Sequence, residues 1–334
     1  MEENKNKWEE AAKRAILQEE GIGEVHDISE TPIVPNLSAY ASLGKATHAA
    51  KGPDEEIQEI LNKTGYDNLV IDNLPSKGRF YPYGTKISIR AARVEEIKDF
   101  STLDENSPTY GFDVDEKLNN ILVSCCKVEF SGKMGSYKDI LEEDRVFIIL
   151  SIRELTFIKG ENKLTNSATC RQCSHDNVHE LRTNNLQYYD ADQEIEKYYS
   201  EVERCYVIPT KSVGVIKLSP ARIGVMNVIT NFIKDKEEKK EKWDKSFLPL
   251  LPYYIFDWRG FDNKSIFNAH VEFQGWSATK FSLVHRLCER IKIGVKTELE
   301  HNCEKCGAGV TIPITFRNGI KSLFVISDIS EELL

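Results

Sequence analysis

Residues 163–181 read KLTNSATCRQCSHDNVHEL, and residues 295–316 read VKTELEHNCEKCGAGVTIPITF. Each stretch places two cysteines, separated by two residues, in a turn between two strand-like segments. Two thiolates at this spacing can bind one metal ion, with each sulfur about 2.3 Å from it. We therefore predict two β-hairpins, each of which supplies half of a tetrahedral metal site.

The two cysteine pairs are separated by a segment much longer than the one that joins the pairs of a compact zinc ribbon. A site shared between the hairpins uses all four residues: Cys170, Cys173, Cys303 and Cys306. Four thiolates leave no open coordination position for water, so the ion would be structural. We predict one Zn²⁺ per chain, which joins the two halves of the chain.

Three other interpretations of these cysteines stay open. The pairs can be redox-active, or they can be reduced thiols that bind no metal. Alternatively, the first pair recruits His175 or His179 as a ligand and binds metal without the second pair. The remaining cysteines lack ligand-like spacing and are predicted to be small core residues: Cys125, Cys126, Cys205 and Cys288.

The segments before the two cysteine pairs follow the same order. Residues 86–90 and 215–218 alternate polar and apolar side chains like strands, and an amphipathic helix is expected after each, over residues 115–126 in the first half. A second helix follows at 142–157 and at 278–291, and corresponding positions recur at a nearly constant offset along the chain. We therefore expect an α+β fold built from an internally duplicated helical domain with two zinc-ribbon-like hairpins.

These patterns divide the chain into three parts. Residues 1–66 are rich in Gly, Pro and Ser after a charged stretch that can form one short helix, and are predicted to be an extended N-terminal arm. Residues 67–190 form the first repeat, and residues 191–334 form the second. Residues 190–206, between the halves, are polar and Tyr-rich and are predicted to be a helical connector.

The composition narrows the class of protein. Apolar residues make up 40% of the 334 residues, which excludes wholesale disorder. No run approaches the roughly 20 apolar residues that a membrane helix needs, and the absence of a secretory pattern leads us to expect an intracellularly made protein. The net charge is −9, and the lysines of residues 234–242 alternate with acids, so nucleic-acid binding is not favoured.

Common catalytic motifs are missing from the sequence. It contains no H-E-x-x-H, no G-x-S-x-G and no complete phosphate loop. The acids at 142–144 begin a predicted helix, where the helix dipole explains them. We therefore predict that the protein is not an enzyme.

The phrase Leu74-Pro-Ser-Lys-Gly-Arg-Phe-Tyr-Pro82 carries a family resemblance. Together with the strand, helices and cysteine pair that follow, it resembles the baseplate hub proteins of T-even-type contractile-tailed bacteriophages. The likeness covers residues 68–185, and it reaches the second half only through the repeat. The second copy lacks the phrase, and the N-terminal arm matches nothing in the family.

The resemblance implies a structural component or assembly factor of the tail baseplate hub. Its expected partners are other hub and tail proteins within a large hetero-oligomer. It would be made in the host cytoplasm and would be located in the virion, in the tail baseplate. The alternative function is a zinc-containing nucleic-acid-binding module.

Overall fold

The first part of the described chain forms a four-stranded antiparallel sheet. Its strands occur in the order β1-β2-β3-β4 and comprise β1 (Asp67–Leu69), β2 (Thr85–Ile89), β3 (Cys126–Phe130) and β4 (Lys133–Met134). The computed structural model describes residues 65–157, 163–314 and 323–324, which all fall within the unit Pro35–Leu334. Ile87 and Ile89 of β2 are buried, as the alternation of residues 86–90 predicts.

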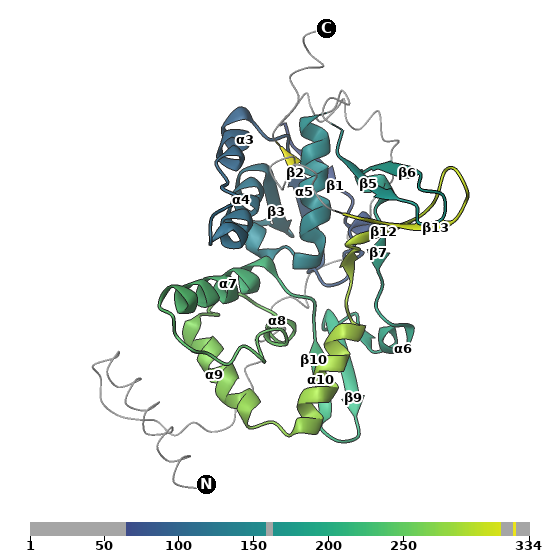
Figure 1. Ribbon diagram of the computed structural model, residues 1–334. Coiled ribbons are helices and arrows are strands. Elements are labelled where there is room, and N and C mark those ends of the chain that lie inside the picture. Colours follow the sequence, from purple (N-terminus) through teal and green to yellow (C-terminus); the bar gives the residue numbers. More distant parts are fainter. Residues whose placement is uncertain (1–64, 158–162, 315–322, 325–334) are drawn as a thin grey trace. The chain divides into compact units, whose positions relative to one another are not determined.

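Three helices accompany this sheet: α3 (Val94–Ser101), α4 (Tyr110–Cys125) and α5 (Glu142–Thr156). Helix α5 buries apolar side chains around much of its circumference, among them Phe147, Ile149 and Ile152. It contacts α4 and β2 of the first half and also α7 and β11 of the second. The sequence prediction of an apolar, central helix at 142–157 is thus confirmed (Figure 1).

The second half contains the antiparallel sheet β10-β9-β8, formed by β8 (Tyr199–Ser200), β9 (Cys205–Thr210) and β10 (Gly214–Leu218). The described residues of this half contain five helices: α6 (Gln193–Glu196), α7 (Ile223–Glu238), α8 (Leu251–Tyr254), α9 (Asn263–Gln274) and α10 (Ala278–Arg290). The buried stripe of α7 includes Val225, Ile229 and Phe232, as its periodicity predicts.

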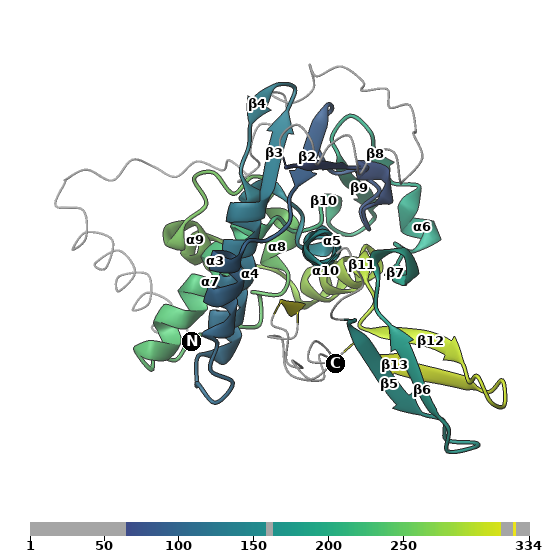
Figure 2. The same ribbon diagram turned by 90° about the horizontal axis from the view of Figure 1, so that it is seen from above.

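Two hairpins complete the described chain. They are formed by β5 (Thr165–Thr169) with β6 (Asp176–Glu180), and by β12 (Glu298–Asn302) with β13 (Gly309–Pro313). Strand β5 contacts β13, and the hairpins lie side by side in both views (Figures 1 and 2). A short pairing of β7 (Tyr188–Tyr189) with β11 (Gly294–Val295) joins the segments next to them.

The fold is therefore mixed, with eight α-helices and several small antiparallel sheets among the described residues. Two local predictions are wrong. The helical connector at 190–206 has only one helical turn, α6, followed by β8 and the start of β9. Cys126 leaves the helix and begins β3, a strand that the periodicity did not reveal.

Three further expectations remain predictions. They are the internal duplication, the boundary between residues 190 and 191, and the N-terminal arm. Residues 1–64 of the predicted arm lie outside the described residues. Among the helices that the structure describes, none has the length and apolar character needed to span a bilayer.

Candidate metal centre

Two short loops carry the four predicted cysteine ligands. Strand β5 ends at Thr169 and β6 begins at Asp176, so the first pair lies in the loop 170–175. Strand β12 ends at Asn302 and β13 begins at Gly309, so the second pair lies in the loop 303–308. Both loops have the same length, and in each the first cysteine directly follows the incoming strand.

The two loops also share a backbone hydrogen-bond pattern. The N–H of Cys170 donates to the carbonyl of His175 at 2.8 Å, and the N–H of Ser174 donates to the carbonyl of Cys170 at 2.9 Å. The same two bonds recur at the equivalent positions of the second loop, at 2.7 and 2.8 Å. Ser174 and Gly307, which follow the second cysteine, both adopt the left-handed region, with φ of +55° and +74°. The two loops are therefore equivalent turns, with serine in the first and glycine in the second at the position of positive φ.

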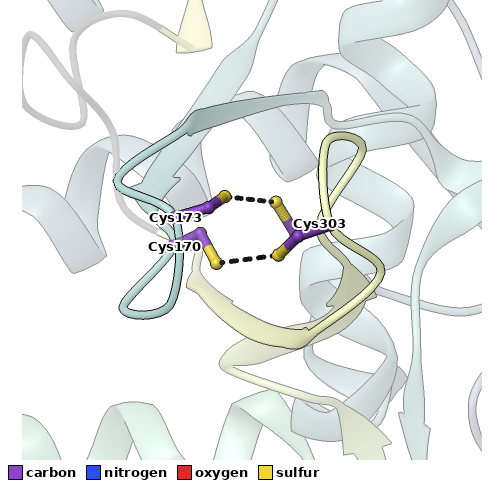
Figure 3. Close-up of side chains that lie close together, drawn as sticks. Cys170, Cys173 and Cys303 are labelled. Atoms are coloured by element: carbon purple, nitrogen blue, oxygen red, sulfur yellow. Dashed lines mark hydrogen bonds between the residues drawn. The ribbon is translucent and has the colours of Figure 1, made fainter.

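The four sulfurs gather at the meeting point of these loops (Figure 3). The Sγ atoms of Cys170 and Cys306 are 3.7 Å apart, and those of Cys173 and Cys303 are 3.6 Å apart. All four lie within 4.8 Å of one another. A tetrahedral zinc site with bonds of about 2.3 Å has sulfur–sulfur edges of about 3.8 Å. The arrangement therefore fits a four-sulfur metal site, with one cysteine of each hairpin facing one of the other.

Burial and backbone dipoles act on these thiols in opposite directions. Burial disfavours the thiolate of Cys303, but the N–H groups of Cys306 and Lys305 favour it and lower its pKa to about 6. The N–H of His175 favours the thiolate of Cys173, but burial and the neighbouring thiols outweigh it and raise that pKa to about 12. A divalent cation would stabilise all four thiolates, because metal binding and thiol deprotonation are coupled.

Polar contacts outside the sulfurs also join the segments around the hairpins. The side-chain amide of Gln187 donates to the carbonyl of Glu300 at 2.9 Å and accepts the N–H of Glu300 at 3.0 Å. The backbone carbonyl of Gln187 accepts the N–H of Lys296 at 2.7 Å. Gln187 thus pairs with the N–H and the carbonyl of Glu300 on β12, and this links the segment after the first hairpin to the second hairpin without the sulfurs.

The histidines near the loops lie outside the group of ligand atoms. His175 is about one-third exposed, and its Nε2 lies 3.9 Å from a carboxylate oxygen of Glu304. The rings of His179 and His301 pack against each other, with centroids 5.5 Å apart. The structure thus brings together the four cysteines rather than Cys170 and Cys173 with His175 or His179.

The other four cysteines behave as core residues. Cys125, Cys126, Cys205 and Cys288 are free and buried. Burial raises the pKa of Cys125 to about 11 and that of each of the other three to about 12. Neutral thiols of this kind are poor nucleophiles and poor metal ligands.

The LPSKG turn has a buried acid at its centre that sequence analysis missed. Asp144 accepts the backbone N–H of Ser76 at 2.8 Å, the Ser76 hydroxyl at 2.7 Å and the Tyr81 hydroxyl at 2.8 Å. Burial raises the pKa of Asp144 to about 6, although these hydrogen bonds oppose the shift. The dipole of α5 alone therefore does not explain Asp144, which anchors a turn that is distant from it in the sequence. Only the serine and tyrosine of the phrase itself could have indicated a buried polar partner.

Charged residues in the last turns of α7 and in the segment after it form ion pairs with one another. Lys236 pairs with Glu241, Lys239 pairs with Asp235, and Lys245 pairs with Glu237. These pairs, of which that of Lys236 is partly buried, reduce the positive charge that a nucleic-acid surface would need.

Comparisons with known proteins found no relative of this chain. No family model matches the chain, and no curated protein and no solved structure shows significant similarity to it.

Proposed function

We propose that this chain is a structural protein without catalytic activity, in which one zinc ion joins two hairpins. The observation that carries the proposal is the convergence of four Sγ atoms within 4.8 Å, from two loops that are far apart in the sequence. Its ligands are Cys170, Cys173, Cys303 and Cys306.

The chemistry of the four sulfurs favours this role. A tetrahedral set of thiolates suits zinc or iron, and it leaves no position for a substrate or an activated water. Structural zinc sites have apparent binding free energies of about 10–16 kcal/mol in small modules, and that energy stabilises the folded state. An ion shared by distant segments therefore stabilises the arrangement of the two hairpins.

We extend the proposal to the baseplate hub of a contractile-tailed phage, as its structural component or assembly factor. Support comes from the resemblance of residues 74–82 and from what those residues do here. Ser76 and Tyr81 are buried and bind Asp144, so the phrase is part of the protein's core. We therefore expect this scaffold to carry a surface that binds other hub and tail proteins.

The metal is tested first by elemental analysis of protein purified under reducing conditions without added metal. We expect one zinc per chain in the wild type and a large loss of zinc in Cys303→Ser. Cys288→Ala is the matched control, because it removes a buried cysteine that lies outside the cluster. Absence of metal, or two zinc ions per chain, would refute the shared site, and iron would assign the same sulfurs to a different metal.

A further inference from the structure

Asn177 bridges the two loops of the candidate metal centre. It lies on β6 and is only 1% exposed. Its Oδ1 accepts the backbone N–H of Glu304, in the second loop, at 3.0 Å. Its Nδ2 donates to the carbonyls of His175 at 3.1 Å and Ala168 at 3.4 Å, on the first hairpin. One buried side chain therefore connects the backbones of both hairpins.

These contacts lie directly beside two of the cysteines. The carbonyl of His175 also accepts the N–H of Cys170, so the amide of Asn177 fixes the group that orients Cys170. Glu304 follows Cys303, so the bond to its N–H fixes the start of the second loop. Cys170 and Cys303 are the two most buried of the four cysteines.

The bridge exists on one side only. When the two loops are aligned on their cysteines, the residue that corresponds to Asn177 is Val310. Valine has no side-chain hydrogen-bonding group. Asn177 therefore supplies a buried side-chain hydrogen bond between the loops that has no counterpart at Val310, and one substitution can measure its contribution.

We propose that Asn177 is the positioning residue of the metal site, and that it holds the two loops at the separation that one ion requires. This inference rests on the proposed function, because it concerns the same four sulfurs. Groups that orient metal ligands typically change metal affinity by 10- to 100-fold when they are removed. Asn177 acts through the backbone of the loops and does not touch the ion.

The test measures zinc affinity of the full chain by competition with a chromogenic chelator. Asn177→Val, which copies the residue of the second hairpin, should weaken zinc binding 10- to 100-fold. Asn166→Leu is the matched control and copies the corresponding residue Leu299. Asn166 is also a buried asparagine of the first hairpin, but its amide has no hydrogen-bond partner among the described residues. We expect zinc affinity of Asn166→Leu to stay within about threefold of the wild type.

A second pair of variants separates positioning from a general loss of stability. Glu304→Pro deletes the N–H that Asn177 accepts. It also removes the exposed carboxylate that lies 3.9 Å from Nε2 of His175, a contact that Glu304→Ala removes alone and should remove without weakening zinc binding. Glu304→Pro should lower the affinity as Asn177→Val does, and the double variant should be no weaker than either single one. Arg171→Pro is the control, because Arg171 aligns with Glu304 in the other loop, where the residue that aligns with Asn177 is Val310.

The outcomes distinguish this inference from the function on which it rests. A wild-type chain that binds no metal refutes the zinc site itself. If the wild type binds zinc and both Asn177→Val and Glu304→Pro bind it equally well, Asn177 does not position the site. Additive losses in the double variant would also overturn the proposal, since the two residues would then act independently.

Discussion

Glu143 shows how burial governs a single side chain in this protein. It lies in the first turn of α5, where the helix dipole favours a negative charge. Its Oε2 is nevertheless buried without a hydrogen-bond partner among the residues that the structure describes. Burial, with a smaller contribution from the neighbouring acids Glu142 and Asp144, raises the pKa of Glu143 to about 8. The cost of desolvating the carboxylate therefore exceeds the stabilisation by the dipole.

This shift predicts a specific dependence of stability on pH. The pKa is higher in the folded state than the ordinary 4.5, so folding favours the protonated acid. The resulting stabilisation is complete below pH 4.5 and is lost as the pH rises to about 8. Glu143→Gln keeps the shape without the titration, so the variant should gain stability relative to the wild type between pH 6 and 9.

The measurement is the free energy of urea unfolding at several pH values, with zinc in excess in every sample. Thiol titration then affects both proteins equally, and the difference between them reports on residue 143. Glu95→Gln, an exposed acid in the first turn of α3, is the control. Parallel profiles for Glu143→Gln and wild type would contradict the predicted burial effect.

At the scale of elements, the turn at residues 74–78 places Gly78 under two constraints. Its φ is +69°, and a Cβ at this position would lie 2.1 Å from Cγ2 of Ile71. Gly78→Ala should therefore combine backbone strain with a steric clash and destabilise the fold by about 2–4 kcal/mol. Gly214 has a similar φ of +78° but open space around it, so Gly214→Ala should cost only about 1 kcal/mol. Thermal or urea unfolding of both variants tests this, and equal losses would exclude the clash with Ile71.

The elements that the sequence predicted well are those with a local signal. Strand β2 and helices α5 and α10 follow from periodicity, and the hairpins follow from the spacing of their cysteines. Strand β3 was missed because α4 ends at Cys125 and β3 begins at Cys126, without turn residues between them. The prediction of a helical connector was wrong because β8 forms by pairing with β9. The intrinsic propensity of the residues does not reveal such a tertiary pairing.

Only part of the candidate site could likewise be predicted from the sequence. Each cysteine pair is recognisable within four residues of sequence, so the four ligands were predictable. Asn177 was not, because Glu304 is remote from it in the sequence and an asparagine in a polar strand has no distinctive pattern. Asp144 was interpreted from its place at a helix N-terminus, and its partners Ser76 and Tyr81 became apparent only in three dimensions.

At the scale of the whole molecule, contacts outside the candidate metal centre join the two halves. Arg222 donates to the carbonyls of Asp139 at 2.7 Å and Phe80 at 3.1 Å, both in the first half. The carboxylate of Asp139 in turn accepts the indole N–H of Trp258 and the guanidinium of Arg259. Removal of the ion should therefore loosen the hairpins first and leave this core connection in place.

The hub proposal makes a prediction about how variants of this chain affect phage assembly. If the chain is a hub scaffold, variants should act through the level of folded protein or through contacts with neighbours, and not through turnover of a substrate. Cys303→Ser leaves an incomplete sulfur shell, so it should lower the level of soluble protein and, with it, the number of complete tails. Deletion of residues 1–60 should leave the protein soluble but remove the arm that we predict to contact other hub subunits. Its tails should fail although the protein is present.

If the chain is a hub scaffold, the experiment is complementation of a phage from which this gene has been deleted, scored by tail formation and by soluble protein level. Cys288→Ala, which leaves the cluster intact, should restore normal tails. Normal tails from the deletion would contradict the role of the arm, and normal tails from Cys303→Ser would show that assembly does not need the complete sulfur shell. Overexpression should distinguish the two variants, because they fail for different reasons. Excess Cys303→Ser protein should rescue tail formation because it raises the amount of folded protein, whereas excess of the truncated chain should not, because its contacts are absent at any concentration.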